Sequence, residues 1–370
     1  MQTYGVYFFP RGSLASALAS DTLFGAVCWA IRLLDLGDLA QILSPPKAPF
    51  AFSSTFPFCL CADMSRLRFY PRPAWLMPSV ADIAAVVQDV QRLTKKKAAR
   101  ITVLEQAKDF KKKTEFLSEA AFAQAVSGKL KANDILRALA KVGDPCVKVF
   151  GSFLLLANER CEIENLLRRA TVQRNHIDRL AGATVEGNLF YTQETFFRRG
   201  AGLWAALRTE PETLKSLILP ALRYLADSGF GADRSTGKGH FDIEVDLQPI
   251  TLPQAGDDAN AWLTLSRYLP AEGELRGEDD ALAYEVAHLR PKRERRFAHL
   301  EADGKGEVYK KPVRMFEPGS VFRLAAVEDP PGRLAELVAA QQNGWPVYQS
   351  GLAVGVPACF PQFSRGGRYE

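Results

Sequence analysis

Runs of apolar residues near the start of the chain predict a strand followed by a helix. YGVYFFP (4–10) is aromatic and β-prone and ends at a proline, which is typical of a strand. In the stretch 22–37, apolar residues recur every three or four positions, which is the period of a helix with one buried face. Ser20 and Asp21 stand before it, and both residue types favour helix starts. We therefore expect a helix that packs on a sheet.

Further along, the pattern alternates between strand-like and helical segments. Strands are predicted at four places, and these are 49–63, 147–156, 188–197 and 240–247. The polar stretch 168–179 favours a loop that leads into the strand at 188–197. Apolar residues at helical spacing predict a helix over 212–228. Between the strands predicted at 49–63 and 147–156, residues 80–141 shift in composition to Ala, Lys, Val and Gln, which indicates an insertion.

This element order is strand, helix, strand, insertion, strand, helix, glycine-rich loop, strand. It is the β-α-β-β-α-β order of a ferredoxin-like or RNA-recognition-type fold. From about residue 250 the order recurs, with a helix expected over 332–344 and a last strand pair over 347–360. The sequence therefore predicts an α+β fold of two tandem ferredoxin-like (RRM-like) domains, 1–247 and 248–370, with a glycine-rich loop and an inserted thumb or basic lobe at about 80–141.

Composition excludes few classes of protein. The 47 Lys and Arg residues against 42 Asp and Glu give a net charge of +5, which weakly favours an anionic partner. The six cysteines form no CxxC pair and no Cys/His quartet, so we expect a reduced, cytoplasmic chain without a structural zinc site. The most apolar run, 23–31, is too short to span a bilayer, so we expect no membrane contact.

Two basic segments have an open interpretation. Nine basic residues lie between Arg92 and Lys113, against only Glu105 and Asp109. They suit either a solvated lobe or an arm that binds nucleic acid, where each phosphate contact releases counterions. The segment 290–296 carries five basic residues and one acidic residue, and suits RNA or a solvated strand edge equally.

The segment SGFGADRSTGKGHF (228–241) contains four glycines, at 229, 231, 237 and 239. Glycine can adopt positive φ and lets another backbone approach closely. With Arg, Ser, Thr and Lys between the glycines, the loop suits a surface that meets phosphates, although a flexible hairpin is the alternative. Walker A and dinucleotide-binding loops run from a strand to a helix, whereas this one runs from a helix to a strand, so neither fits.

The ordered motifs resemble the RAMP proteins of CRISPR systems. Their ferredoxin-like domains carry a glycine-rich loop between the last helix and the last strand, where GFGADRSTGKG stands here. Together with SDTLFGAVCWAIRLL, RNHIDRLAGATVEGNLFYTQETFF, LTLSRYLP and SGLAVGVP, the set is similar to the subunit of type III-A (Csm) interference complexes that caps the guide RNA. The similarity extends over nearly the whole chain. The length of the 80–141 insertion departs from the family and leaves the bounds of its projecting thumb open.

The resemblance implies a non-catalytic subunit that binds the repeat-derived 5′ tag of the crRNA. Its implied partners are the large polymerase-like subunit, the adjacent backbone RAMP subunit and, indirectly, the target RNA, and it implies no cofactor. The implied RNA-binding residues are Ser20, Asp21, Thr22, Arg174, Asn175, Asp178, Arg179, Gly229, Gly231, Arg234, Ser235, Gly237, Lys238, Gly239, Gly351 and Gly355. Asp178 is equally suited to pairing with a neighbouring arginine. The equivalent subunit of another type III subtype has the same fold and role.

Enzymatic readings are weaker. Relatives that cut the guide precursor use a general base, usually a histidine near the first helix, but this chain has no histidine before His176. A nuclease that pairs His176 with His240 is the catalytic alternative. For metal-dependent cleavage, Asp178 and Asp233 are the nearest candidate ligands. A purely structural adaptor would leave the glycine-rich loop unexplained.

Overall fold

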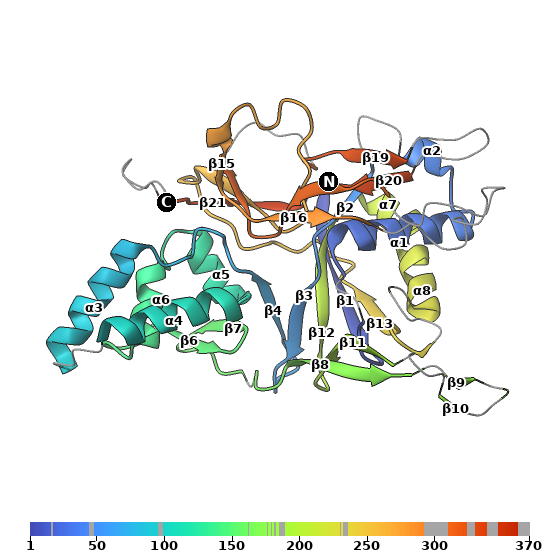
Figure 1. Cartoon of the computed structure of the whole chain (residues 1–370). Coiled ribbons are helices and arrows are strands. Elements are labelled where there is room, and N and C mark those ends of the chain that lie inside the picture. Colours follow the sequence, from blue (N-terminus) through green and yellow to red (C-terminus); the bar gives the residue numbers. More distant parts are fainter. Residues whose placement is uncertain are drawn as a thin grey trace.

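The computed structural model contains all 370 residues (Figure 1). The description that follows covers residues 1–15, 18–43, 48–94, 99–161, 163–175, 177–178, 180, 183–184, 189–229, 231, 236–291, 310–323, 330–338 and 347–361. It is a mixed α+β protein in which a large sheet runs through the body and a second group of strands covers one end (Figure 1). No helix among these residues is long and apolar enough to cross a membrane.

Within the described residues, nine strands form the main sheet. Its path is β13-β1-β12-β3-β4-β5-β7-β6, and β2 also pairs with β12. The first four strands on this path are β13 (Phe241–Val245), β1 (Gln2–Pro10), β12 (Ala201–Thr209) and β3 (Phe56–Leu60). β1 and β12 lie at the centre of these four strands and pair antiparallel. The strands predicted at 4–10, 49–63 and 240–247 are confirmed as β1, β3 and β13, whereas β12 was not predicted, because the third strand of the unit was expected at 188–197.

Two helices pack against this part of the sheet. They are α1 (Ser20–Leu33) and α8 (Leu219–Ser228), and α8 continues from the short α7 (Pro211–Thr213) through a π-helical turn, Leu214–Ile218. The apolar faces predicted from the helical spacing are buried: Val27 and Leu222 share one core with Val6 and Phe8 of β1. A shorter helix, α2 (Leu39–Ile42), follows α1.

The predicted insertion forms a helical lobe beside the sheet (Figure 1). Its helices are α3 (Val80–Thr94), α4 (Ala99–Lys113), α5 (Glu119–Val126) and α6 (Ala132–Leu139). The sheet extends into this lobe through β4 (Arg66–Pro71), β5 (Phe116–Ser118), β7 (Phe153–Leu156) and β6 (Val147–Phe150). Of the basic residues, Lys95, Lys96 and Lys97 lie outside the described residues, whereas Lys108, Lys111 and Lys112 are exposed on α4.

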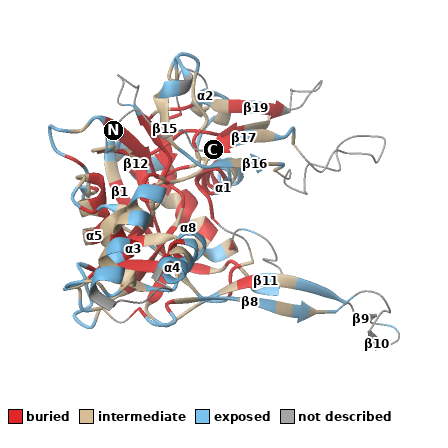
Figure 2. Ribbon diagram, turned by 60° about the vertical axis from the view of Figure 1, so that its left-hand side comes forward, coloured by how far each residue is buried: buried red, intermediate tan, exposed pale blue. Residues whose placement is uncertain are grey.

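A long hairpin projects from the body at the opposite edge (Figure 2). It consists of β8 (Leu167–Arg174) and β11 (Phe190–Phe197), with β9 (Ile177–Asp178) and β10 (Ala183–Thr184) at its tip. The strand at β11 was predicted. The loop predicted over 168–179 is wrong for β8, because seven residues of this polar stretch, 168–174, pair in register with β11. Pairing with a β-prone partner overrides the weak strand propensity of β8.

The C-terminal part consists of strands in its described residues. One sheet has the order β15-β18-β14-β21, and two further pairs are β16-β17 and β19-β20. The strands are β14 (Ala261–Thr264), β15 (Ala281–Ala283), β16 (Val286–Leu289), β17 (Val313–Phe316), β18 (Val321–Arg323), β19 (Leu334–Val338), β20 (Val347–Ser350) and β21 (Gly355–Ala358), with a 3-10 turn at Glu278–Asp280. The remaining strand of the main sheet, β2 (Phe50–Phe52), pairs with β12.

The helix predicted over 332–344 is wrong where the structure describes it. Leu334–Val338 is a strand that pairs with β20, and it buries Ala335 and Leu337 on either side of exposed Glu336. Burial therefore alternates with period two, as expected for a strand with one buried face. The composition of this segment permits a helix or a strand, and pairing with β20 decides for the strand. The second ferredoxin-like unit is therefore not confirmed.

The two halves of the chain share one hydrophobic core. The main cluster contains residues of β1 and α1 together with Leu263, Val354 and Val356. Backbone bonds also join the halves: Ser54 N donates to Leu265 O at 2.9 Å, and Cys359 N donates to Val126 O at 2.7 Å. These contacts cross the predicted boundary between the domains 1–247 and 248–370, so this boundary stays a prediction.

Candidate nucleic-acid interface

A buried carboxylate, Glu194 of β11, joins the hairpin to the glycine-rich loop. Arg174 of β8 donates to its Oε1 at 2.6 Å, and Lys238 of the glycine-rich loop donates to its Oε2 at 2.6 Å. Ser13, in the loop after β1, donates to the same Oε2, and Lys238 also donates to the Ser13 hydroxyl. Two predicted RNA-binding residues from segments 64 positions apart in sequence (238 minus 174) therefore meet at one anion.

The buried charge of Glu194 is balanced by cations and hydrogen bonds. The Glu194 side chain is 0% exposed, whereas Arg174 and Lys238 keep 19% and 21% of their side chains exposed. Burial opposes ionisation, but the hydrogen bonds from Lys238, Ser13 and Arg174 outweigh it and lower the pKa of Glu194 to about 2. At neutral pH the site thus holds one buried anion beneath two partly exposed cations, and leaves net positive charge toward the solvent.

The described glycines of the loop have a conformational reason to be glycine. Gly229, Gly231, Gly237 and Gly239 all have positive φ, between 65° and 91°. Close approach adds to this, since a Cβ on Gly229 would lie 3.0 Å from the Gly239 carbonyl oxygen, and a Cβ on Gly12, in the loop after β1, would lie 3.0 Å from the Gly237 carbonyl oxygen. Arg11 N donates to His240 O at 2.9 Å, so the loop after β1 and the glycine-rich loop are packed together. Gly237 itself is exposed, and a Cβ there would meet nothing within 4 Å.

The hairpin exposes large aromatic and aliphatic side chains. Phe190 is 45%, Tyr191 62% and Phe196 41% exposed, and Leu180 at the tip is 99% exposed. Neighbouring residues on a strand point to opposite faces, so Phe190 and Phe196 share the face of Glu194, while Tyr191 lies on the other. Across the strand pair, Phe190 is opposite Arg174 and Phe196 is opposite exposed Arg168. This face combines aromatic surface with positive charge beside the glycine-rich loop.

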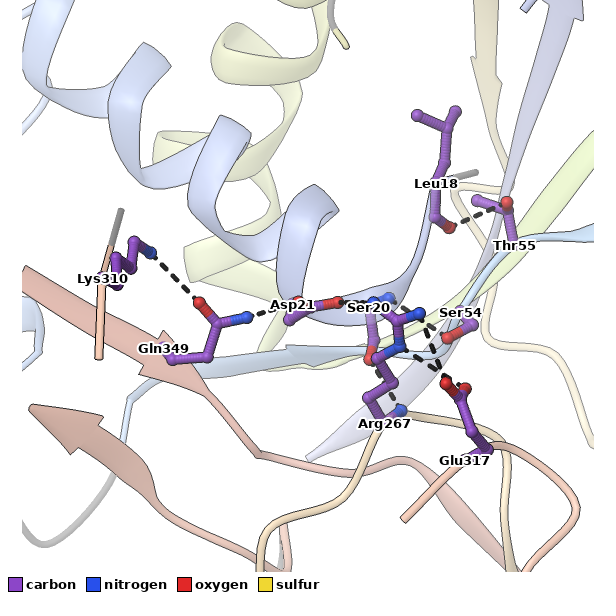
Figure 3. A network of polar contacts seen from close by, with 9 residues as sticks. All are labelled: Leu18, Ser20, Asp21, Ser54, Thr55, Arg267, Lys310, Glu317 and Gln349. Carbon is purple, nitrogen blue, oxygen red and sulfur yellow. Dashed lines mark hydrogen bonds and ion pairs between the residues drawn. The ribbon is translucent and has the colours of Figure 1, made fainter. Parts of the chain in front are cut away.

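The start of α1 is engaged inside the protein (Figure 3). Ser20 and Asp21 are buried, with 3% and 9% exposure. Arg267 N donates to Ser20 Oγ at 2.9 Å, and the Arg267 guanidinium lies 3.3 Å from Asp21 Oδ1. Gln349 Nε2 donates to the other Asp21 oxygen.

The same network continues into the C-terminal half. Lys310 donates to Gln349 Oε1 at 3.1 Å, and burial lowers the pKa of Lys310 (Figure 3). The Arg267 guanidinium also pairs with Glu317 at 3.3 Å. Of the three residues expected at this helix start, only Thr22 is exposed. Ser20 and Asp21 are therefore placed where they join the two halves of the chain.

Gly351 directly follows β20 and Gly355 begins β21, so both lie in the C-terminal part of the chain and not in the glycine-rich loop. A Cβ on Gly351 would lie 2.2 Å from the Leu269 Cβ, and a Cβ on Gly355 would lie 2.6 Å from the Trp262 ring. Close packing of backbone against side chain explains both glycines.

Several predicted residues can be placed only in part. Asn175 is exposed at the end of β8, and the backbone of Asp178 lies in β9. Arg179, Arg234, Ser235, His176 and Asp233 lie outside the described residues.

Sequence reasoning missed Glu194 and Ser13. The available signal was a single acidic residue inside an aromatic and hydroxyl-rich strand, opposite a stretch rich in arginine. Such a residue is rarely buried unless it is paired. That signal predicts an ion pair but not its partner, because Lys238 reaches Glu194 only through the fold.

No cluster of three or more His, Cys, Asp or Glu residues suited to a metal ion occurs in the described part of the chain. The His240 ring packs at the foot of the loop, where a Cβ on Gly229 would lie 3.3 Å from its Cε1 and Nε2 atoms.

Comparison with known proteins gives this geometry a context. No family model matches the sequence. The CRISPR system Cms protein Csm4 of Thermococcus onnurineus (strain NA1) is 23% identical over 268 residues, which cover 72% of this chain and 75% of that protein. The predicted resemblance to this type III-A subunit is confirmed.

Solved structures agree at the level of the fold. A chain in the crystal structure of a Csm3-Csm4 subcomplex of the type III-A CRISPR-Cas interference complex has a TM-score of 0.59 at 14% identity, over 96% of this chain and 99% of that chain. A chain in the crystal structure of a Csm1-Csm4 cassette in complex with cA4 has a TM-score of 0.55 at 16% identity, over 98% of this chain and 100% of that chain. The likeness in fold to these chains thus extends over nearly the full length.

Proposed function

We propose that this chain is a non-catalytic RNA-binding subunit of a type III-A CRISPR effector complex. In this role it binds the repeat-derived 5′ tag of the crRNA along the hairpin face that carries Phe190 and Phe196, next to the glycine-rich loop. The same role includes docking to the large polymerase-like subunit and to the adjacent backbone RAMP subunit. The Csm4 relative and the Csm1-Csm4 and Csm3-Csm4 assemblies support this choice of partners.

The observation that carries the proposal is the Glu194 cluster. It holds two cations and a projecting aromatic strand in one fixed arrangement, with part of each cation exposed. Single-stranded RNA is bound by this combination, because bases stack on exposed aromatic rings while cations and backbone N–H groups meet phosphates. A structural ion pair alone would not require the exposed rings beside it.

The experiment is RNA binding by the assembled complex. Replacing both exposed rings, Phe190→Ala with Phe196→Ala, should weaken binding of a 5′-tagged guide by about tenfold or more, since each base stacked on an aromatic ring contributes about 1–3 kcal/mol. Tyr191→Ala is the matched control, because this ring is the more exposed one but lies on the opposite face of the same strand. Guide occupancy and affinity would be measured on complexes purified with the variant subunit.

The outcomes separate RNA binding from protein docking. Loss of guide affinity in the double variant, with the neighbouring subunits retained, supports the proposal. Unchanged guide affinity overturns the assignment of this face. Loss of the large subunit with the guide retained would instead assign the face to protein docking.

The catalytic alternative is tested separately. A nuclease that uses His240 would cut repeat RNA when the purified chain is incubated with it, and His240→Ala would abolish the cut. We expect the repeat RNA to stay intact.

A further inference from the structure

Three thiols meet where the hairpin joins the body. Cys61 Sγ lies 3.1 Å from Cys161 Sγ, and Cys59 Sγ lies 3.5 Å from the same sulfur. All three cysteines are free. Cys59 is fully buried, whereas Cys61 and Cys161 are partly exposed. The contact joins segments that are 100 positions apart in the sequence, so folding alone brings these thiols together.

The position of this cysteine cluster relates it to the hairpin. Cys59 ends the paired part of β3 next to β12, and Cys61 follows in the turn to β4. Cys161 belongs to the segment between β7 and β8, and it packs in a small apolar cluster with Leu167 and Phe197, the two residues at the base of the hairpin. A covalent bond from Cys161 to the β3 end would therefore tie this base to the main sheet.

We propose that Cys61 and Cys161 are a redox modification site that forms a reversible disulfide. A disulfide has an S–S distance of about 2.05 Å, so the two sulfur atoms need to approach by only about 1 Å. The pair is Cys61 with Cys161, because this contact is the shorter one and both residues reach the surface. Cys59 is 0% exposed and is shielded from a dissolved oxidant.

Hydrogen peroxide serves as the oxidant, in two steps. The Cys61 thiolate attacks one peroxide oxygen, the O–O bond breaks, and Cys61 becomes a sulfenic acid while the departing hydroxide takes up a proton to form water. The Cys161 sulfur then attacks the Cys61 sulfur. The S–O bond breaks, the S–S bond forms, and the proton from Cys161 leaves with the hydroxyl as a second water.

Two electrons pass from the two thiols to the peroxide, and a thiol reductant reverses the reaction by exchange. Burial and the adjacent thiols raise the pKa of Cys161, so Cys161 carries its proton at neutral pH and gives it up to the departing hydroxyl as its sulfur attacks Cys61.

The test uses the purified full-length chain. After treatment with hydrogen peroxide and alkylation of the remaining thiols, cleavage after Lys and Arg gives one peptide, 48–66, with Cys59 and Cys61, and another, 161–168, with Cys161. We expect a cross-linked pair of these peptides that is lighter than their sum by two hydrogen atoms and that disappears after reduction.

Variants assign the bond. Cys61→Ser and, independently, Cys161→Ser should lose the cross-link, whereas Cys59→Ala should keep it. Cys146→Ser is the matched control, since this exposed cysteine lies outside the cluster, and it should change nothing. Circular dichroism of each variant shows that it is folded.

Two results would overturn the proposal. One is the absence of the cross-link at a peroxide dose that already oxidises Cys146. The other is a cross-link that persists in Cys61→Ser or that fragmentation assigns to Cys59. Neither result depends on RNA, so this site and the proposed RNA-binding role stand or fall separately.

Discussion

At the scale of single residues, Glu194 gives the sharpest prediction. Glu194→Gln keeps the shape of the side chain but leaves Arg174 and Lys238 without their buried counter-charge. Because both cations are partly exposed, we expect the free energy of unfolding at pH 7 to fall by about 2 kcal/mol, which is less than the roughly 3–5 kcal/mol that breaking a fully buried pair costs. Chemical denaturation of the purified chain measures this difference.

The pH dependence of that difference follows from the lowered pKa. The pKa of Glu194 falls from 4.5 to about 2 on folding, so its contribution is complete above about pH 4.5 and is lost as the pH falls toward 2. The stability gap between the original chain and Glu194→Gln should therefore be wide at pH 7 and narrow below pH 4.5. Glu164→Gln, at an exposed position, is the control and should leave stability unchanged. A gap independent of pH would show that the charge of Glu194 does not matter.

Residue patterns predicted part of this cluster. Arg174 and Lys238 were expected to bind an anion, and the structure pairs both with a carboxylate of the same chain. A local pattern identifies a cation in a loop but not the anion it meets, because Glu194 and Ser13 come close only when β11 and the loop after β1 lie side by side. Reversing the charge of Arg174 would consequently disturb the fold as well as any RNA contact, and the exposed rings give the cleaner test.

At the scale of elements, the start of α1 distinguishes a structural role from RNA binding. Asp21→Asn removes the charge opposite Arg267 and one acceptor for Gln349. We expect a loss of about 1.5 kcal/mol of stability, as for a hydrogen bond to a charged group, with guide affinity of the assembled complex unchanged. Thermal unfolding and guide binding, measured on the same preparation, test both parts.

Asp257→Asn, an exposed change of the same charge, is the control for Asp21→Asn. Reduced guide affinity at full stability would instead support the helix start as an RNA contact.

The elements that sequence predicted well have strong periodicity. The buried faces of α1 and α8, and the strands β1, β11 and β13, follow from spacing alone. The errors lie where pairing decides the structure. β8 is polar but pairs along eight residues with β11, and Leu334–Val338 has helix-forming residues but completes a sheet edge. Such tertiary pairings override intrinsic propensity and leave no local signal.

At the scale of the whole molecule, the shared core predicts that the chain unfolds as one unit. Ser266 Oγ donates to Phe52 O at 2.8 Å and accepts from Val354 N at 2.9 Å, so one buried hydroxyl joins three distant segments. Both halves contribute to the same apolar cluster, and neither can bury its share alone. We expect a single cooperative transition in denaturant, reported equally by tryptophan fluorescence and circular dichroism.

A fragment of residues 1–247 tests the same point directly. Without the C-terminal strands it exposes the apolar surface that Leu263 and Val354 cover, so we expect weak near-ultraviolet circular dichroism and binding of an apolar dye, as in a molten globule. Supplying residues 248–370 in trans should restore the near-ultraviolet signal. This is the control that shows that the fragment is still able to fold. A fragment that unfolds cooperatively by itself, together with two transitions in the full chain, would show that the halves are independent domains. The Asp21 network would then join two stable bodies and would not complete a single core.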